Sequence, residues 1–241
     1  MNNYGIQLYS VRDAMEKDVA GTLQKLADLG YKYVEFAGFF GYAAEEIKEM
    51  LDRTGLICSG AHTPWTDLLP ENIAETVKYH KAIGNPNIIV PGADLSTYEK
   101  VVELCEVMKN AQIILEAEGI RLGYHNHAHE FKVNPWGSTS HGEIERRTGV
   151  DFEIDVFWIF EAGLDTIAVL ERLKDRIRVI HLKDGFRGGE GNPLGQGEVP
   201  IKEIIDYAVL QGWTMVVESE TVSPSGMDEA TACIEYLKSI G

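Results

Sequence analysis

The feature that most constrains the fold is an alternation of short apolar runs with longer amphipathic stretches, repeated along the whole chain. Each short run is rich in β-branched or aromatic residues, as strands are, and each longer stretch carries apolar residues at helical spacing. A glycine follows several of the longer stretches, which is a common way for a helix to end. The pattern predicts eight strand-plus-helix units in 241 residues, or about 30 residues per unit, the usual size of such a repeat.

The boundaries of these elements follow from the residues that interrupt the pattern. The predicted strands span Tyr4–Tyr9, Tyr33–Phe36, Leu56–Ala61, Asn87–Val90, Arg121–His125, Asp151–Asp155, Ile177–Leu182 and Thr214–Glu218. The predicted helices span Val19–Leu29, Ala44–Thr54, Glu71–Ile83, Ser96 or Thr97 to Glu118, Thr139–Thr148, Asp165–Lys174, Ile201–Gln211 and Met227–Ser239.

Uniform alternation of strands and helices indicates parallel strands joined by right-handed crossovers. Two α/β folds satisfy this pattern, a closed (β/α)8 barrel and an open doubly wound sheet. The dinucleotide-binding form of the open sheet should carry G-x-G-x-x-G after its first strand, but the chain reads Tyr9-Ser10-Val11-Arg12 there. Because there are eight units and no linker, we predict a single (β/α)8 TIM barrel domain over residues 1–241.

The charge balance bears on partners and location. The chain has 22 Lys and Arg against 38 Asp and Glu, a net charge of −16. This opposes binding to nucleic acids or anionic membranes, which need a basic surface. No apolar run approaches the roughly 20 residues of a membrane span, and Arg12 and Asp13 lie where a signal peptide would be apolar. Three separated cysteines suggest reduced thiols. We therefore expect a cytoplasmic protein with a small-molecule substrate.

Ionisable residues gather at the ends of the predicted strands, where (β/α)8 barrels place their active sites. His125, Asp155, His181 and Glu218 follow one another at intervals of 30, 26 and 37 residues. Since each interval is close to one strand-plus-helix unit, we expect these residues at equivalent heights on four successive strands. A buried core does not tolerate such groups unless they are paired or bind something. Their convergence over the barrel mouth is therefore a prediction of the spacing.

Two imidazoles and two carboxylates make a mixed nitrogen and oxygen site that suits Mn²⁺, Co²⁺, Zn²⁺ or Fe²⁺ and leaves positions for substrate oxygens. A single histidine at a strand end is more often a structural residue, and we interpret His129 and His141 in that way. Glu153, Asp184 and Glu220 are interpreted either as salt-bridged supports or as solvated side chains.

The chain resembles the sugar phosphate isomerase/epimerase family, whose members have the xylose isomerase-like TIM barrel. The resemblance runs from GIQLYSVRD through VEFAGFFG, GLICSGAHTPW, GYHNHAHEF, FEIDVFWIFEAGLD and VIHLKD to WTMVVESE, and so covers almost the whole chain. The motifs Y-H-N-H-x-x-E-F and H-x-K-D, in this order, are fairly specific for one branch of the family. They identify the fold and the metal site better than the substrate.

The resemblance implies one divalent metal ion, most often manganese, with cobalt, magnesium or zinc as variants. The implied ligands are Asp155, His181 and Glu218. At the fifth strand many epimerases of the family have glutamate, whereas this chain has His125, with Glu130 five residues further on. His125 is our first choice for that ligand because it is level with the strand end, and Glu130 is the alternate.

The implied activity is isomerisation or epimerisation of a keto-sugar or related polyol. In this chemistry a carboxylate removes a proton next to a carbonyl, and the metal stabilises the enediolate that develops. Glu218 is the candidate base, and Glu130 is its partner if it is not a ligand. Candidate substrate-binding residues are Glu35, His62, His127 and Lys183, and the resemblance suggests that some of Trp65, Trp136 and Trp158 pack against the sugar ring.

Other functions stay open. A lyase or hydrolase that eliminates from a keto-sugar or 3-keto-glycoside would use the same enolate chemistry. A barrel that only binds sugars belongs to another class, and no ligand position is missing as that would require. The same superfamily includes a DNA endonuclease with three zinc ions, which needs a basic face that this acidic chain lacks. Because the family often forms dimers or tetramers, a homo-oligomer is possible.

Overall fold

The computed structural model describes residues 3–189 and 191–241. Its largest feature is a closed barrel of parallel strands. These strands are β1 (Tyr4–Gln7), β2 (Tyr33–Phe36), β3 (Ile57–His62), β4 (Asn87–Val90), β5 (Arg121–His125), β6 (Asp151–Asp155), β7 (Ile177–Leu182) and β10 (Thr214–Val217).

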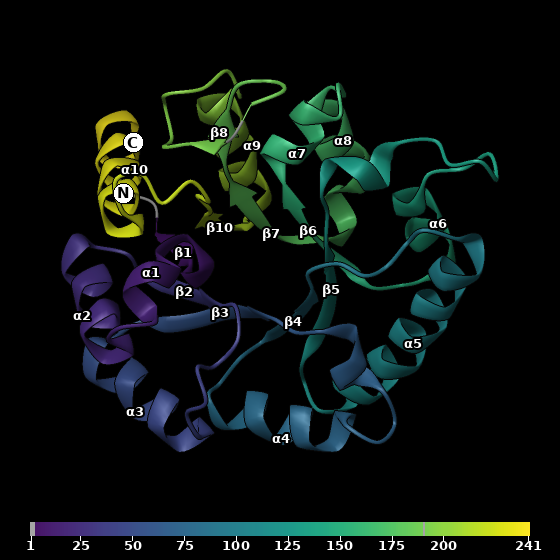
Figure 1. Cartoon of the computed structure of the whole chain (residues 1–241), viewed down its shortest axis with the longest axis horizontal. Coiled ribbons are helices and arrows are strands. Elements are labelled where there is room, and N and C mark those ends of the chain that lie inside the picture. Colours follow the sequence, from purple (N-terminus) through teal and green to yellow (C-terminus); the bar gives the residue numbers. More distant parts are fainter. Residues whose placement is uncertain (1–2, 190) are drawn as a thin grey trace.

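Helices form a ring around the barrel (Figure 1). They are α1 (Arg12–Met15), α2 (Val19–Leu29), α3 (Ala44–Thr54), α4 (Ile73–Ala82), α5 (Tyr98–Ala117), α6 (Ser140–Arg147), α7 (Val156–Glu161), α8 (Thr166–Leu173), α9 (Ile201–Gln211) and α10 (Gly226–Ile240). Short 3-10 helices follow several strands, and a small hairpin of β8 (Asp184–Gly185) and β9 (Gly191–Asn192) follows β7.

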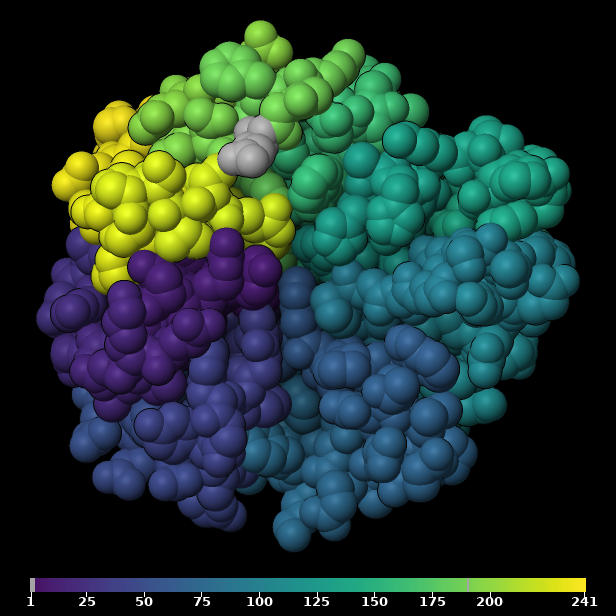
Figure 2. Space-filling model, in the orientation of Figure 1, coloured from purple at the N-terminus to yellow at the C-terminus, as the bar shows by residue number. Residues whose placement is uncertain are grey.

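The order of the strands around the barrel is β1-β10-β7-β6-β5-β4-β3-β2. Because β1 pairs with both β10 and β2, the barrel formed by the described strands has no open edge. The first and last segments of the chain, purple and yellow, consequently lie side by side (Figure 2). The predicted (β/α)8 barrel is confirmed.

Local sequence explains where the helices begin and end. Helix α2 begins after Asp18, whose side chain accepts a hydrogen bond from the Gly21 amide at 2.9 Å. It ends at Gly30, whose φ of +102° is in the left-handed region that favours glycine. Its residues Leu23 and Leu26 are fully buried against the barrel.

Side chains alternate between the two surfaces of each barrel strand. In β2 the apolar Val34 and Phe36 belong to the hydrophobic core, while Glu35 between them takes part in a polar cluster with side chains from other strands. In β6 Ile154 likewise belongs to the core, while Glu153 and Asp155 on either side of it are acidic residues among the inward-facing ionisable groups. The apolar core therefore lies between strands and helices, and ionisable groups collect inside the barrel.

The register of the strands corrects one prediction, that the four strand-end residues lie at equivalent heights. His125 is level with Glu153, so Asp155 lies two residues higher, whereas Asp155 and His181 are level. His181 in turn is level with Val216 of β10, two residues before Glu218. Closing a sheet into a barrel requires tilted strands and a staggered register. A stagger of two residues keeps all four side chains facing inward.

The first strand is shorter than predicted, because it ends at Gln7 instead of Tyr9. The Gln7 side chain accepts a hydrogen bond from the Tyr9 amide at 3.1 Å and starts a 3-10 helix over Leu8–Val11. Helix α7 and the β8–β9 hairpin were not predicted. Among the described residues, no helix combines the length and the apolar character needed to cross a membrane.

Candidate metal centre

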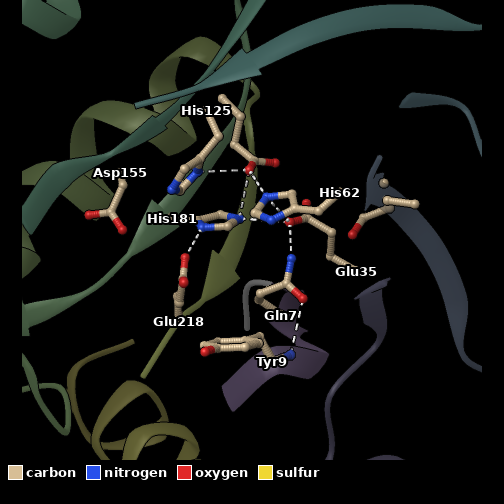
Figure 3. Close-up of polar contacts among 12 residues, drawn as sticks. Gln7, Tyr9, Glu35, His62, His125, Asp155, His181 and Glu218 are labelled. Carbon is tan, nitrogen blue, oxygen red and sulfur yellow. Dashed lines mark hydrogen bonds and ion pairs between the residues drawn. The ribbon is translucent and has the colours of Figure 1, made fainter. Parts of the chain in front are cut away.

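Four side chains converge at the ends of β5, β6, β7 and β10. Each of the residues His125, Asp155, His181 and Glu218 offers one ligand atom, and these atoms all lie within 4.8 Å of one another. All four residues are buried, and Figure 3 shows them around one common point. The convergence that the spacing predicts is thus present in the folded chain.

Asp155 uses its two carboxylate oxygens differently. Oδ1 accepts hydrogen bonds from the amides of Phe157 at 2.9 Å and Trp158 at 3.2 Å, and so caps α7. Oδ2 is buried and has no hydrogen-bond partner among the described residues. Burial and the Glu218 charge raise the pKa of Asp155 to about 7, although the Lys183 charge lowers it. A buried anionic oxygen without a partner is costly, and a bound cation would remove that cost.

His181 has carboxylates at both ring nitrogens. Nδ1 is hydrogen-bonded to Glu218 Oε2, and Nε2 lies 2.9 Å from Glu35 Oε1 and 3.1 Å from Glu153 Oε1. Burial lowers the pKa of His181, but Glu153, Glu35 and Glu218 outweigh it and hold the pKa well above its usual range. This imidazole is therefore fixed in position by groups from three other strands.

His125 differs from His181 because a single carboxylate contacts it. Its Nδ1 lies 3.0 Å from Glu153 Oε1, and its other ring nitrogen points towards Asp155 (Figure 3). Burial lowers the pKa of His125 to about 4. The ring is therefore neutral at neutral pH, the form in which a ring nitrogen can bind a cation.

A second layer of polar side chains lies beneath the four converging residues. Gln7 Nε2 donates a hydrogen bond to Glu35 Oε1 at 2.6 Å, and His62 Nε2 lies 2.7 Å from Glu153 Oε1. Burial and the Glu153 charge raise the pKa of Glu35 to about 7. Gly60 leaves the room that Glu35 occupies, since a Cβ there would lie 3.1 Å from Glu35 Oε2 and 2.6 Å from Ile89 Cδ1.

The donor set fits one divalent cation. It offers two imidazoles and two carboxylates, one of which is Asp155 with its unpartnered Oδ2, and this matches the preferences of borderline transition metals. Burial raises the pKa of Glu218, but His181 and Lys183 outweigh it and hold the pKa well below its usual range, so this ligand candidate is a carboxylate. Mn²⁺, Co²⁺, Zn²⁺ and Fe²⁺ can all accept this set of ligands.

A cavity of about 450 Å³ opens above the cluster. It borders on His125 and Glu218, so a molecule in it could reach the metal position. Tyr9, which is 45 % exposed, is an aromatic residue on its wall that the sequence analysis did not single out. Among the described residues, Trp65, Trp136 and Trp158 are not in its lining, which consists of Tyr9, Ala37, Gly38, His62, Pro64, Pro91, His125, His127, Glu218 and Glu220.

The alternate strand-five ligand, Glu130, is engaged elsewhere. It is fully buried, accepts a hydrogen bond from the Tyr124 hydroxyl at 3.1 Å, and accepts another from the His127 amide at 2.8 Å. Among the described residues, two groups of side chains could hold a metal ion. One is the group at the strand ends, and the other consists of His62, His125, Glu153 and His181. Glu130 belongs to neither group, whereas His125 belongs to both. The geometry therefore favours His125 at this position.

The remaining predicted substrate-binding residues are divided between the cavity and the layers around it. His62 and His127 line the cavity, while Glu35 lies in the layer beneath. Lys183 is fully buried, forms an ion pair with Glu220 at 2.6 Å, and has its Nζ 4.3 Å from the centre of the Trp158 ring.

Two residues interpreted as supports have clear structural contacts. Asp184 is buried and accepts hydrogen bonds from the amides of Gly195 at 2.9 Å, Gly197 at 3.0 Å and Val199 at 3.1 Å, which fixes the segment after β9. Glu153 is the acceptor for histidines described above. It lies two residues before Asp155 on the same inward face, so the period of two in a strand was the signal that could have assigned it to the site.

These features define a TIM barrel with a cluster of potential metal ligands at the carboxyl ends of its strands. Residues 23–240 match the family model described as xylose isomerase-like TIM barrel. The chain belongs to this family. The narrower branch indicated by Y-H-N-H-x-x-E-F stays a prediction. A search of curated protein sequences returned no significant match.

Several solved structures have the same fold. A sugar phosphate isomerase/epimerase from Parabacteroides distasonis is 24 % identical, with a TM-score of 0.86 over 99 % of this chain and 98 % of that one. The probable 3-DHS dehydratase AsbF from Bacillus anthracis is 13 % identical, with a TM-score of 0.77 over 98 % and 99 %. An L-ribulose 3-epimerase is 15 % identical, with a TM-score of 0.70 over 99 % and 94 %. At these identities the likeness concerns the fold.

Proposed function

We propose that the protein is a divalent-metal-dependent isomerase or epimerase that acts on a keto-sugar or related polyol. The observation that carries the proposal is the convergence of His125, Asp155, His181 and Glu218 at the floor of an open cavity. Membership of the xylose isomerase-like family and the epimerases among the similar folds support it. Mn²⁺ is our first choice of metal, with Co²⁺, Mg²⁺ and Zn²⁺ as alternatives.

The four converging residues would hold the cation. When bound, the cation supplies Lewis-acid polarisation of a substrate carbonyl and its neighbouring hydroxyl. The residues around it would position the sugar and limit access of water, because the ligands are buried and the cavity borders on His125 and Glu218.

Glu218 is the proposed base. It lines the cavity, and its pKa is held well below its usual range, so it is ionised and can take a proton from a carbon next to the carbonyl. His62 and His127 also line the cavity. Burial lowers the pKa of each, but Glu153 for His62 and Glu130 for His127 outweigh it and raise the pKa, which favours the protonated form that donates hydrogen bonds to sugar oxygens.

The test has two parts. Protein purified without chelator should contain about one divalent ion per chain, measured by elemental analysis, and the ion should be lost in His181→Ala. The metal-loaded protein should then be incubated with a panel of ketoses and 3-keto-glycosides in D₂O. Deuterium on a carbon next to the carbonyl of an isomerised or epimerised product is the expected result.

Other results of the panel would replace the proposal. Loss of a substituent from the β-carbon, with an unsaturated product or a released aglycone, would make the protein a lyase or hydrolase. Sugar binding without turnover by fully metal-loaded protein would make it a binding protein. Absence of bound metal, even after incubation with Mn²⁺, Co²⁺ or Zn²⁺, would remove the basis of the proposed chemistry.

A further inference from the structure

One buried carboxylate contacts three histidines inside the barrel. Glu153 of β6 is 1 % exposed and lies level with His125 of the neighbouring strand β5. Its Oε1 atom lies 2.7 Å from His62 Nε2, 3.0 Å from His125 Nδ1 and 3.1 Å from His181 Nε2. Two of these three histidines are the imidazoles of the proposed metal centre.

The contacts determine which ring nitrogens are left for a cation. A carboxylate only accepts hydrogen bonds, so the nitrogens facing Glu153 are those that carry hydrogen. His125 then has its other nitrogen on the side of Asp155, away from Glu153 (Figure 3). The second nitrogen of His181, Nδ1, is hydrogen-bonded to the Glu218 carboxylate, so a cation held by Glu218 and His181 would have to replace that hydrogen. Glu153 Oε1 thus sets the tautomer and the ring orientation of His125. It shares Nε2 of His181 with Glu35 Oε1, which lies closer to that nitrogen, at 2.9 Å.

The position of Glu153 argues against its being a ligand itself, although its oxygen and the nitrogens of His62, His125 and His181 form a second group that could hold a cation. Glu153 is not in the cavity lining, whereas Glu218 and His125 are. A catalytic metal needs open positions that face the substrate. Both groups reach the cavity, the lower one through His62 and His125 and the upper one through His125 and Glu218. Within the described residues, only the upper group places one of its carboxylates in the lining.

We propose that Glu153 is a positioning residue that holds His125, and together with Glu35 also His181, in the orientation required for binding the cation, and that it supplies negative charge beneath the centre. The inference rests on the metal centre of the proposed function. Carboxylates that accept a hydrogen bond from a ligand imidazole orient the ring and raise its basicity, and their loss typically weakens metal binding by about 10- to 100-fold.

Two substitutions separate charge from hydrogen bonding. Glu153→Gln keeps an oxygen acceptor but loses the charge, and Glu153→Leu loses both. We expect Mn²⁺ binding, measured by titration calorimetry or by the electron paramagnetic resonance of free Mn²⁺, to weaken about 10-fold in the first and up to about 100-fold in the second. The visible spectrum of bound Co²⁺ should also change, because the His125 ring loses the carboxylate that fixes it.

The control is a carboxylate of similar burial in another part of the fold. Glu143 of α6 is 6 % exposed and pairs with Arg146 and Arg147, so Glu143→Gln should leave the Mn²⁺ affinity and the Co²⁺ spectrum unchanged. Thermal unfolding of the metal-free proteins reports on the fold. A positioning role predicts that the Glu153 variants still unfold cooperatively without metal, and that their Mn²⁺ affinity and Co²⁺ spectrum change while those of Glu143→Gln do not.

The outcomes distinguish this inference from the proposed function. If the unsubstituted protein binds no divalent ion, the metal centre itself is wrong. If it binds Mn²⁺ and both Glu153 variants bind it equally well with the same Co²⁺ spectrum, only the positioning role is wrong. If Glu153→Gln abolishes binding while Asp155→Asn retains it, Glu153 is a ligand of the lower group and the inference is overturned.

Discussion

Two buried histidines show how differently the fold uses the same side chain. His181 inside the barrel and His141 of α6 are 0 % and 1 % exposed. His181 is surrounded by Glu35, Glu153 and Glu218. The His141 ring is stacked between two phenylalanines, with centroid distances of 4.5 Å to Phe131 and 4.7 Å to Phe152.

The charges around the two rings have opposite consequences. Burial lowers the pKa of both rings, but three carboxylates outweigh burial at His181 and hold its pKa well above its usual range. At His141, burial and the charges of Arg172 and Arg176 lower the pKa to about 3, because Glu130 raises it by less. Glu145 lies 4.0 Å from the His141 ring. Burial thus makes His141 a neutral packing residue, whereas the carboxylates around His181 place that ring in a cluster that could bind a cation.

The largest effect that this comparison predicts is on metal binding. His181→Ala removes a proposed ligand and should weaken Mn²⁺ binding more than about 100-fold, beyond the loss expected for a residue outside the ligand set. His141→Phe preserves the aromatic stack and should leave the affinity within about twofold. Titration calorimetry on both variants tests this, and equal affinities in the two variants would contradict the assignment of the site.

The second effect is on stability. A ligand that binds only the folded state stabilises it by about 2.7 kcal/mol when present at 100 times its Kd. Adding Mn²⁺ at that concentration to chelator-treated protein should therefore raise the melting temperature by about 5–10 °C for a chain of this size. The rise should persist in His141→Phe and disappear in Asp155→Asn. A metal-independent melting temperature in the unsubstituted protein would count against the centre.

The third and smallest effect concerns pH. Because the pKa of His141 is lowered to about 3 in the folded state from an ordinary value near 6.5, the unfolded state binds more protons as pH falls below about 6.5. The free energy of unfolding therefore falls as the pH drops from about 6.5 to about 3. At pH 5 the effect of His141 lowers the free energy of unfolding by about 2 kcal/mol.

His141→Phe should remove this part of the acid sensitivity. Urea unfolding at pH 8 and pH 5 measures it: the fall in unfolding free energy between the two should be about 2 kcal/mol smaller in the variant. His80 has its pKa lowered to about 4 by burial and remains in both proteins, so some acid sensitivity should persist. An unchanged fall would mean that His141 is not neutral in the folded protein.

Much of the fold could be predicted because periodicity is a local property. The boundaries of β2, β4, β5, β6 and β7, and of α2, α3 and α9, are those that the sequence pattern predicts. Errors occur where a side chain, not a period, decides. Gln7 ends β1 early by holding the Tyr9 amide, and Asp155 starts α7 by capping it, although its Val-Phe-Trp sequence has little helical pattern.

The site was predicted less completely. The spacing of His125, Asp155, His181 and Glu218 was enough to expect their convergence, but the interpretation of Glu153 stayed open between support and solvated side chain. The contacts of Glu153 with imidazoles from three other strands depend on the register between strands. That register cannot be predicted from a single sequence.

The sequence by itself determined that the chain forms a barrel and that ionisable residues end its strands, because hydrophobic period and strand length are encoded within each short segment. The tertiary structure alone decided how these residues meet. Closure of all eight strands sets the two-residue stagger that lifts Asp155 above His125. Distances of about 3 Å, which exist only after closure, then decide which ring nitrogens are paired and which histidines are charged.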